Sequence, residues 1–388
     1  TPRKQTVRSQ RVAEEQPQPW VRLEVHHGIG WGRVRGLLRR TLRKQEPEVA
    51  VLMERCRLAP LELTLNGQSL PRLVGWEESP ALVASYRTAG EKRPGCEITL
   101  GKLQALRTVT GSSRGPFSLV MTVGGGAPSE TVFVHHGLTF RRPDLRLGPG
   151  VRALVFAPEL KKDLSHTALV EDDTFKLLQE SLRLEMFELF GELEPMLPEL
   201  PAERRPEALA CLDWLVGFRL QHGDLPGALR LATRVADARE GKPSVELALS
   251  QYMLAHIDRE LGRPKLARKR LEEAMQALAA CFGVTFRTNH TTGREDSYVS
   301  FVTFEGARDE EAYLAMAAAE QILFGPRHDL FIERLRFLRQ FYSFRNPARS
   351  REYDALVNAD LVDGQLLPQL ASQARYVGKK DLPKVSLG

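Results

Sequence analysis

The stretch ELKKDLSHTALVEDDTFKLLQESL, residues 159–182, decides the fold because the character of the sequence changes within it. The preceding segment VRALVFA, residues 151–157, is a short apolar run typical of a buried strand. The quoted stretch then crosses a charged segment and a Leu-Ser-His step before it enters an amphipathic helix. It therefore predicts a strand-to-helix corner between an α+β region and an all-α region.

The region before this corner, residues 20–172, has more strand patterns than helix patterns. Helical periodicity is found in residues 33–45 and 47–59. Alternating residues around Asn66-Gly67 predict a hairpin in LELTLNGQSL. Further strands are expected in WVRLEVHH (20–27), in CEITLGKLQAL (96–106), in VRALVFA, and as two strands around a Gly-rich turn in SLVMTVGGGAPSETVFVHH (118–136). The polar residues 1–19 are expected to form a flexible or extended lead-in.

The region after the corner has helical periodicity and contains an internal repeat. Residues 173–283 include GDLPGALRLA, which begins at Gly223, and GRPKLARKRL, which begins at Gly262, 39 residues later. In each copy a helix ends at the glycine, and a small residue, Ala228 or Ala267, allows the next helix to pack closely. We therefore expect a helical-hairpin repeat domain. It resembles tetratricopeptide repeats, whose usual period is about 34 residues.

The remaining segments complete the predicted organisation. Residues 284–306 contain two β-rich runs around a polar loop and predict a protruding β-hairpin inserted among the helices. Residues 307–375 are expected to form C-terminal helices, and residues 376–388 an extended tail with Pro383.

The composition is that of an ordinary globular protein with 388 residues, 42% hydrophobic and 27% charged. No apolar run approaches the roughly 20 residues that a membrane span needs, and no secretion signal is recognisable. The four cysteines are Cys56, Cys96, Cys211 and Cys281. Their wide spacing disfavours both a zinc site and a disulfide framework, so we expect a cytoplasmic protein.

The formal charge of +6 is concentrated near the N-terminus. Residues 1–44 contain eleven Lys/Arg and three Glu, which leaves about −2 for the rest of the chain. Candidate phosphate or nucleic-acid contacts are Arg33, Arg35, Arg39, Arg40, Arg43 and Lys44. Such a segment can attract phosphates or acidic protein surfaces, and it is equally compatible with a solvated tail and helix face.

The order of elements around the corner resembles the transducer, or middle, region of GHKL ATPases. This family includes the ninety-kilodalton heat-shock chaperones, MutL and the gyrase B subunit. The resemblance covers roughly residues 20–190 and rests on a helix ending in ERCRLAP, the Asn-Gly strand pair, further strands, and the corner itself. In the chaperones a Leu-x-x-Ser-Arg-Glu step precedes the helix, and Leu164, Ser165 and His166 occupy the matching positions here.

The resemblance implies that this corner projects a cation toward the γ-phosphate of ATP bound to a separate domain, where it would stabilise charge in phosphoryl transfer. His166 stands where the chaperones have arginine, and Lys161 and Lys162 lie close by. The family's ATP-binding motifs are absent from this sequence, so ATP and Mg²⁺ are expected only with a nucleotide-binding domain that precedes Thr1 or belongs to a partner. The alternative is a solvated corner whose acidic residues complement the helix N-terminus.

Other candidate sites are incomplete. Gly28, Gly30 and Gly32 could let backbone amides approach a phosphate, but Arg33 breaks the dinucleotide-binding spacing and a domain turn explains the glycines equally well. Within each of the pairs His26-His27 and His135-His136, the two adjacent side chains point to opposite faces of a strand, so we expect no metal site. Ser165 beside His166 lacks a nucleophile elbow. The stretch ERLRFLRQFYSFRNPARSR (333–351) interleaves arginine with aromatics, which suits either a helix core or base stacking.

The sequence therefore predicts a non-catalytic coupling and protein-binding part of a chaperone-like, GHKL-type ATPase, with a protein partner on the helical repeat surface. No enzymatic activity is expected of this chain alone. Two alternatives remain: a nucleic-acid-associated protein that uses its basic N-terminal segment, and a subunit that completes an ATP site in trans through Lys161 or Lys162.

Overall fold

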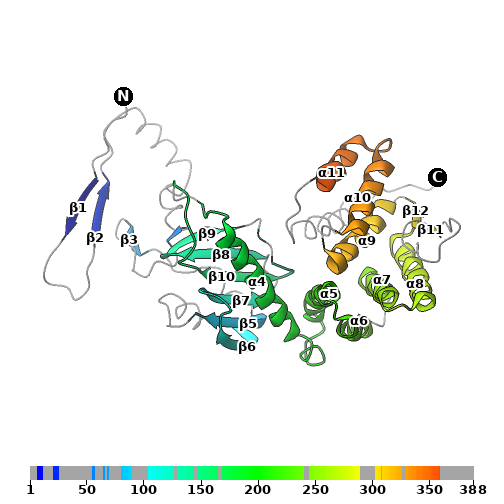
Figure 1. Cartoon of the computed structure of the whole chain (residues 1–388), viewed down its shortest axis with the longest axis horizontal. Coiled ribbons are helices and arrows are strands. Elements are labelled where there is room, and N and C mark those ends of the chain that lie inside the picture. The colour runs from blue at the N-terminus through cyan, green and yellow to red at the C-terminus, as the bar shows by residue number, and fades with distance from the viewer. Residues whose placement is uncertain are drawn as a thin grey trace, which may run out of the picture.

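The computed structural model describes residues 7–11, 21–25, 55–56, 64–65, 68–69, 80–89, 104–125, 129–142, 145, 147–164, 168–239, 244–288, 302–306, 308–325 and 328–358. Within these residues, a mixed β-sheet lies in the N-terminal part of the chain and most of the helices follow it (Figure 1). The predicted α+β class is confirmed in this coarse form.

The central sheet has six strands in the described part of the chain. They are β5 (Ala81–Thr88), β6 (Ala105–Ser112), β7 (Ser118–Val123), β8 (Glu130–His135), β9 (Leu138–Arg141) and β10 (Val151–Phe156). Their spatial order is β6-β5-β7-β10-β8-β9. The pairs β5–β6 and β8–β10 are parallel, and the other neighbours are antiparallel.

The two strands predicted around the Gly-rich turn, β7 and β8, are present but are not neighbours. β10 lies between them, with Leu154 opposite Val120 of β7 and beside Val132 of β8. β5 was not predicted at all, because ALVASYRT lacks the alternation of apolar and polar residues that marked the other strands. The strand expected over 96–106 overlaps β6 only at its end, and residues 96–103 lie outside the described residues.

Two short hairpins precede the sheet in sequence. β3 (Thr64–Leu65) pairs with β4 (Gln68–Ser69), which confirms the hairpin predicted at Asn66-Gly67. β1 (Val7–Arg11) pairs with β2 (Val21–Val25), so part of the segment predicted as a flexible lead-in is a strand.

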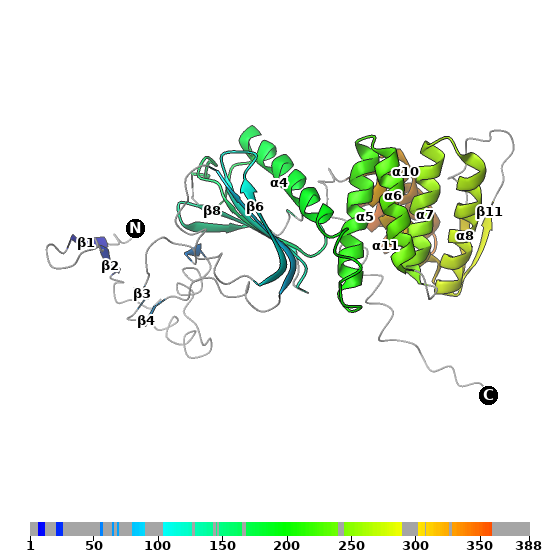
Figure 2. The same cartoon turned by 90° about the horizontal axis from the view of Figure 1, so that it is seen from below.

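Both faces of the central sheet are buried. One face packs against α4 (Asp173–Gly191), whose Phe175 ring centroid lies 5.4 Å from that of Phe133 in β8. Figure 2 shows this helix running across the sheet. The opposite face forms a second apolar cluster of buried residues: Ala84, Tyr86, Val120, Val132, Val134, Leu154 and Phe156. Burial on both faces explains why β7 and β10 are almost continuously apolar.

Two helical hairpins follow α4. They are α5 (Arg205–Gln221) with α6 (Leu225–Arg239), and α7 (Val245–Glu260) with α8 (Pro264–Phe282). Gly223 and Gly262 occupy the two turns in left-handed conformations, with φ of 78° and 71°. Ala228 and Ala267, at the starts of the second helices, are both buried.

The turn hydrogen bonds of the two hairpins repeat with the same 39-residue offset as the sequence. The amide of Asp224 donates to the carbonyl of Arg219 at 2.9 Å, and the amide of Arg263 donates to the carbonyl of Asp258 at 2.9 Å. These are the six-to-one bonds of a Schellman motif, which satisfies carbonyls at the helix end and favours glycine there. The repeat is therefore a structural unit as well as a sequence pattern.

The chain continues through a β-hairpin and three further helices. β11 (Thr285–Thr288) and β12 (Val302–Glu305) pair antiparallel where the inserted hairpin was predicted. The helices are α9 (Asp309–Phe324), α10 (Asp329–Tyr342) and α11 (Pro347–Asn358). The amide of the buried Phe304 in β12 donates to the Tyr313 hydroxyl of α9 at 2.7 Å, which ties the hairpin to the helical core.

α9 packs on the face formed by the first helix of each hairpin, α5 and α7 (Figure 1). The Nε2 amide of Gln221 donates to the carbonyls of Ile322 and Leu323 at 3.3 and 3.1 Å. At Gly217 the two backbones approach so closely that an added Cβ would lie 1.8 Å from the Ile322 carbonyl oxygen. This face of the helical array is therefore covered by the chain itself.

Replacing Gly217 tests how tightly α9 closes this face. We expect Gly217→Ala to lower the free energy of unfolding by about 1–3 kcal/mol, because the new methyl group forces α5 and α9 apart. Gly191, at the end of α4, has nothing within 4 Å of an added Cβ. Gly191→Ala is therefore the matched control and should leave stability unchanged or raise it by up to about 1 kcal/mol. Chemical denaturation measures both; equal effects would contradict the close packing.

The N-terminal part of α5 joins the helical region to one end of the sheet. The Cys211 thiol donates to the Pro149 carbonyl at 3.4 Å, and the Arg204 guanidinium donates to the Pro80 carbonyl at 3.1 Å. One hydrophobic cluster runs from the α4 side of the sheet through α5 and on into α10.

Candidate functional site

The corner between β10 and α4 folds as a small hairpin, which we call the corner hairpin (residues 157–172). The amide of Val170 donates to the Lys161 carbonyl at 2.8 Å, and the amide of Asp163 donates to the Ala168 carbonyl at 3.0 Å. The Asp163 carboxylate accepts the Ala168 amide at 3.1 Å. Leu164, at the end of the first arm of the corner hairpin, is fully exposed.

The base of the corner hairpin is fixed to the start of α4. Asp172 is the N-cap, and its Oδ1 accepts the Phe175 amide at 3.1 Å. Its Oδ2 lies 3.1 Å from Nζ of Lys161. The hydrogen bond from Lys161, followed by the one from the Phe175 amide, lowers the pKa of Asp172 below its ordinary value. Lys161 is therefore engaged in holding the corner.

The helix N-terminus at this corner is already supplied with negative charge. Asp172 caps it, and Asp173 stands in its first turn. Glu171 forms an ion pair with Arg142 at 2.7 Å. Because these carboxylates complement the positive end of α4, the amides there are not a free site for a phosphate group.

Lys162 differs from Lys161 in having no carboxylate partner among the described residues. Its backbone bridges to Leu169 across the corner hairpin. Its positive charge acts on the buried His135, whose pKa is lowered first by burial and then by the charges of His136 and Lys162. The Ala157 carbonyl, 3.4 Å from Nδ1 of His135, opposes this shift. Of the two candidate lysines, Lys161 is the exposed one and has a carboxylate partner, whereas Lys162 is half-buried and has none in the described part of the chain.

His166, the third candidate cation, and Ser165 lie outside the described residues, and so do residues 26–54 with the six basic candidates from Arg33 to Lys44. His135 and His136 are placed: the first is buried in β8, and the second is exposed at a left-handed φ of 48°. In the described part of the chain, no group of three His, Cys, Asp or Glu side chains is arranged to hold a metal ion.

The C-terminal arginines make contacts within the chain. Arg339 pairs with Asp354 at 2.8 Å, and Arg345 pairs with Asp309 at 3.1 Å while stacking on Phe341. Phe337 and Phe341 are half-buried against the core, whereas Phe344 lies beyond the end of α10 and is 96% exposed. The paired arginines have less charge available for nucleic-acid phosphates than the sequence indicated.

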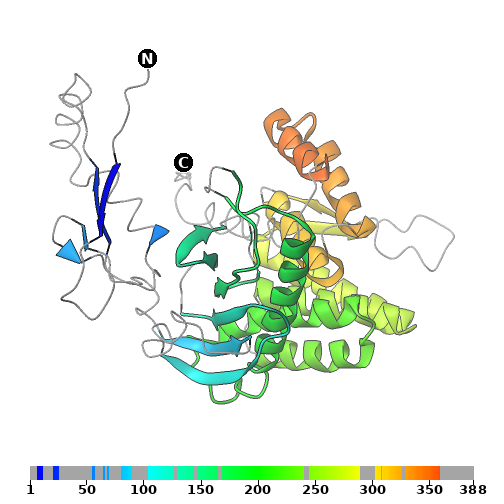
Figure 3. The same cartoon turned by 60° about the vertical axis from the view of Figure 1, so that its left-hand side comes forward.

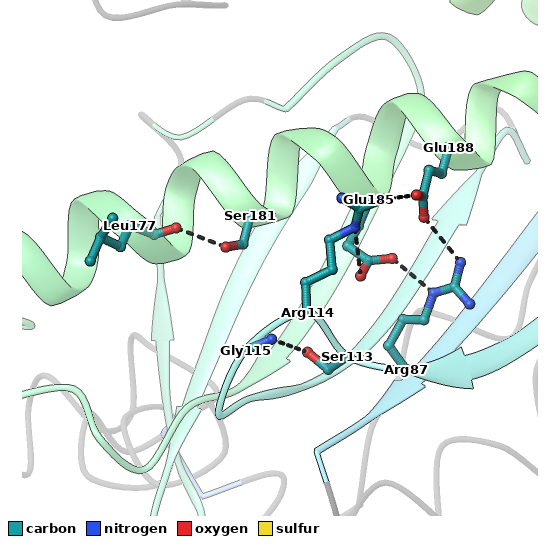
Figure 4. A network of polar contacts seen from close by, with 8 residues as sticks. All are labelled: Arg87, Ser113, Arg114, Gly115, Leu177, Ser181, Glu185 and Glu188. Carbon is teal, nitrogen blue, oxygen red and sulfur yellow. Dashed lines mark hydrogen bonds and ion pairs between the residues drawn. The ribbon is translucent and has the colours of Figure 1, made fainter.

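A row of arginine–glutamate ion pairs joins α4 to the edge of the sheet. Nε of Arg87 donates to the buried Glu185 at 2.8 Å, and Arg114 pairs with Glu188 (Figure 4). Further along α4, Arg107 pairs with Glu192 at 2.5 Å. Sequence reasoning missed these pairs. One signal was present, because Glu185, Glu188 and Glu192 recur at the spacing of a single helix face.

A second polar cluster is buried among α7, α9 and α10. Glu320 accepts hydrogen bonds from the Tyr252 hydroxyl at 2.6 Å and from the Arg334 guanidinium at 2.9 Å. His256 lies beside Tyr252 with both ring nitrogens unpartnered among the described side chains and backbone. Arg334 was also missed, although it stands among Phe331, Leu335 and Leu338 on the apolar stripe of α10.

A scan against protein-family models found no match to this chain, and searches of curated proteins and of solved structures found none either. Among the described helices, none is long and apolar enough to cross a membrane.

Proposed function

We propose that this chain is the coupling part of a GHKL-type, chaperone-like ATPase and that the corner hairpin contacts the nucleotide-binding domain. That domain would belong to another part of the native polypeptide or to a partner protein. The observation that carries the proposal is the corner hairpin itself. It is held at its base by Lys161 and Asp172, and it presents an exposed apolar residue, Leu164, at its tip.

Two further observations support a contact made by this hairpin. A leucine that is fully exposed at a tip gains apolar burial only when another surface covers it. Beside it, Lys162 retains a charge that no described carboxylate neutralises. A rigid base with a cation and an apolar tip suits a segment that senses a phosphate in a neighbouring domain.

The proposal assigns different roles to the two lysines. Lys161 maintains the corner, whereas Lys162 faces the γ-phosphate when the nucleotide-binding domain is present. The chain by itself needs no bound ATP or Mg²⁺ for this role. The three described cysteines are unpaired, which suits a cytoplasmic setting.

We propose that protein partners bind a restricted surface of the two helical hairpins. Because α9 covers α5 and α7, a partner would contact the outward faces of α6 and α8. The exposed residues of α8 include Lys265, Leu266, Lys269 and Glu273. Gly223, Ala228, Gly262 and Ala267 serve only to shape the hairpins.

Alanine substitution of each lysine separates these roles. In the native protein together with its nucleotide-binding domain, we expect Lys162→Ala to lower kcat for ATP hydrolysis about 100-fold, since a cation near the developing charge is lost. Lys161→Ala should lower kcat less than Lys162→Ala does, because the backbone hydrogen bonds of the corner hairpin remain, and Lys162→Arg should retain most activity. Steady-state ATPase assays measure all three. Full activity in Lys162→Ala would remove the proposed role.

A further inference from the structure

β6 is an unusually open edge of the central sheet. It is eight residues long and, among the described strands, stands last in the order, next to β5 only. Six of its residues are exposed, among them Thr108, Thr110 and Gly111. Figures 1 and 3 show this strand along the outer margin of the sheet. Strand edges of this length normally carry a device that prevents pairing with another chain.

The usual protective devices are weak on β6. Its only charged residue is Arg107, whose guanidinium is held by Glu192 at 2.5 Å. The strand contains no proline or lysine, and Thr108, Val109 and Thr110 have high strand propensity. The opposite edge, β9, is protected differently, because it is only four residues long.

We propose that β6 pairs antiparallel with β6 of a second copy of this chain, so that the two sheets become continuous across a twofold axis at Val109. This pairing does not depend on the proposed coupling role. The occupant is inferred from the self-complementarity of the strand, because a twofold axis places each residue opposite a defined partner of the other copy.

The register centred on Val109 matches the side chains well. Val109 faces its own copy, and Thr108 faces Thr110 twice. These β-branched pairs are favourable across an antiparallel ladder. At the ends, Leu106 faces Ser112 and Arg107 faces Gly111, so a large residue always meets a small one and no two arginines are opposed. The exposed Leu106, at 55%, lies within the paired segment.

The dimer is expected to be weak and dependent on concentration. Each new backbone hydrogen bond contributes only about 1 kcal/mol net, and association costs at least about 4 kcal/mol. The pairing should therefore appear as a sedimentation coefficient that rises with protein concentration in the full chain.

A charge-swap experiment tests both the interface and its register. Thr108 and Thr110 are exposed and lie on the same face, so substitutions there should leave the monomer folded. The double variant Thr108→Lys/Thr110→Lys places like charges opposite each other and should be monomeric at all concentrations. The double variant Thr108→Lys/Thr110→Glu places a positive side chain of one copy across from a negative side chain of the other in this register. It should therefore restore the dimer.

Sedimentation velocity on the wild type and both variants gives the result, with circular dichroism as the check of folding. A wild type that stays monomeric at all concentrations overturns the proposal. A strand from a different protein would then be the next candidate to pair with β6. Association that persists in the Lys/Lys variant also overturns it, because the interface then lies elsewhere. Failure of the Lys/Glu variant to associate overturns the Val109 register.

Discussion

Arg334→Ala is expected to lower the free energy of unfolding by about 3–5 kcal/mol. The guanidinium is 6% exposed and pairs with Glu320, which is fully buried. Burial alone would lower the Arg334 pKa, but the carboxylate of Glu320 raises it above its ordinary value. Removing Arg334 therefore leaves a buried negative charge whose remaining hydrogen-bond partner, in the described part of the chain, is Tyr252.

A matched variant separates this buried charge from the packing of the side chain. Arg334→Met combined with Glu320→Leu and Tyr252→Phe removes the ion pair and the hydroxyl bonded to it while keeping similar volumes. We expect this triple variant to be more stable than Arg334→Ala, since no unpaired charge remains. Urea denaturation of both proteins measures the difference. A triple variant less stable than the single one would show that the ion pair itself stabilises the contact among α7, α9 and α10.

His256 is expected to make folding stability depend on pH in a mildly acidic range. Burial, followed by the charges of Arg259, Arg334 and His328, lowers its pKa to about 3. The unfolded chain titrates this residue near pH 6.5, so it binds a proton that the folded chain refuses. The contribution of the neutral His256 to the free energy of unfolding is fully present above about pH 6.5. Below that pH it falls by up to about 1.4 kcal/mol per pH unit.

Replacing the imidazole should abolish this dependence. His256→Phe keeps an aromatic ring beside Tyr252 and Phe324 and has no proton to bind. We expect its stability to fall less steeply than that of the wild type between about pH 6.5 and 5, where carboxylates remain ionised and the buried His135 keeps its own contribution. His222→Gln, at an exposed position of the first hairpin turn, is the control and should keep the wild-type slope. Equal slopes in the wild type and His256→Phe would contradict the buried, neutral state.

The parts of the fold that were predicted correctly depend on local signals. Asn66-Gly67 marked the β3–β4 hairpin, and the recurrence of Gly223 at Gly262 marked the two helical hairpins. In both cases a few neighbouring residues determine the backbone conformation. The beginning of α4 at Asp173 was predicted for the same reason, because the charged residues before it supply the N-cap.

The parts that were not predicted depend on contacts between distant segments. β10 enters the sheet between β7 and β8 although β9 precedes it in sequence. Arg87 and Glu185 are 98 residues apart, so no local pattern pairs them. The covering of α5 and α7 by α9 is likewise a consequence of packing. It narrows the surface left for a protein partner, which the sequence placed on the helical repeat without specifying a face.

The candidate corner was located from the sequence, but its two lysines could not be distinguished there. Lys161 and Lys162 are adjacent to each other in the sequence, and both precede acidic residues. Only the structure shows that Lys161 lies 3.1 Å from Asp172 whereas Lys162 has no described carboxylate partner. The exposure of Leu164 also depends on the fold of the corner hairpin.

The measurement that tests the coupling proposal most directly is ATP binding and turnover by the complete native protein, compared with the 388-residue chain on its own. The account predicts that the native protein, with its nucleotide-binding domain, hydrolyses ATP and that the isolated chain does not. It further predicts that Leu164→Asp lowers turnover by disrupting the contact of the corner hairpin. A native protein that neither binds nor hydrolyses ATP, alone or with its partners, would contradict the account.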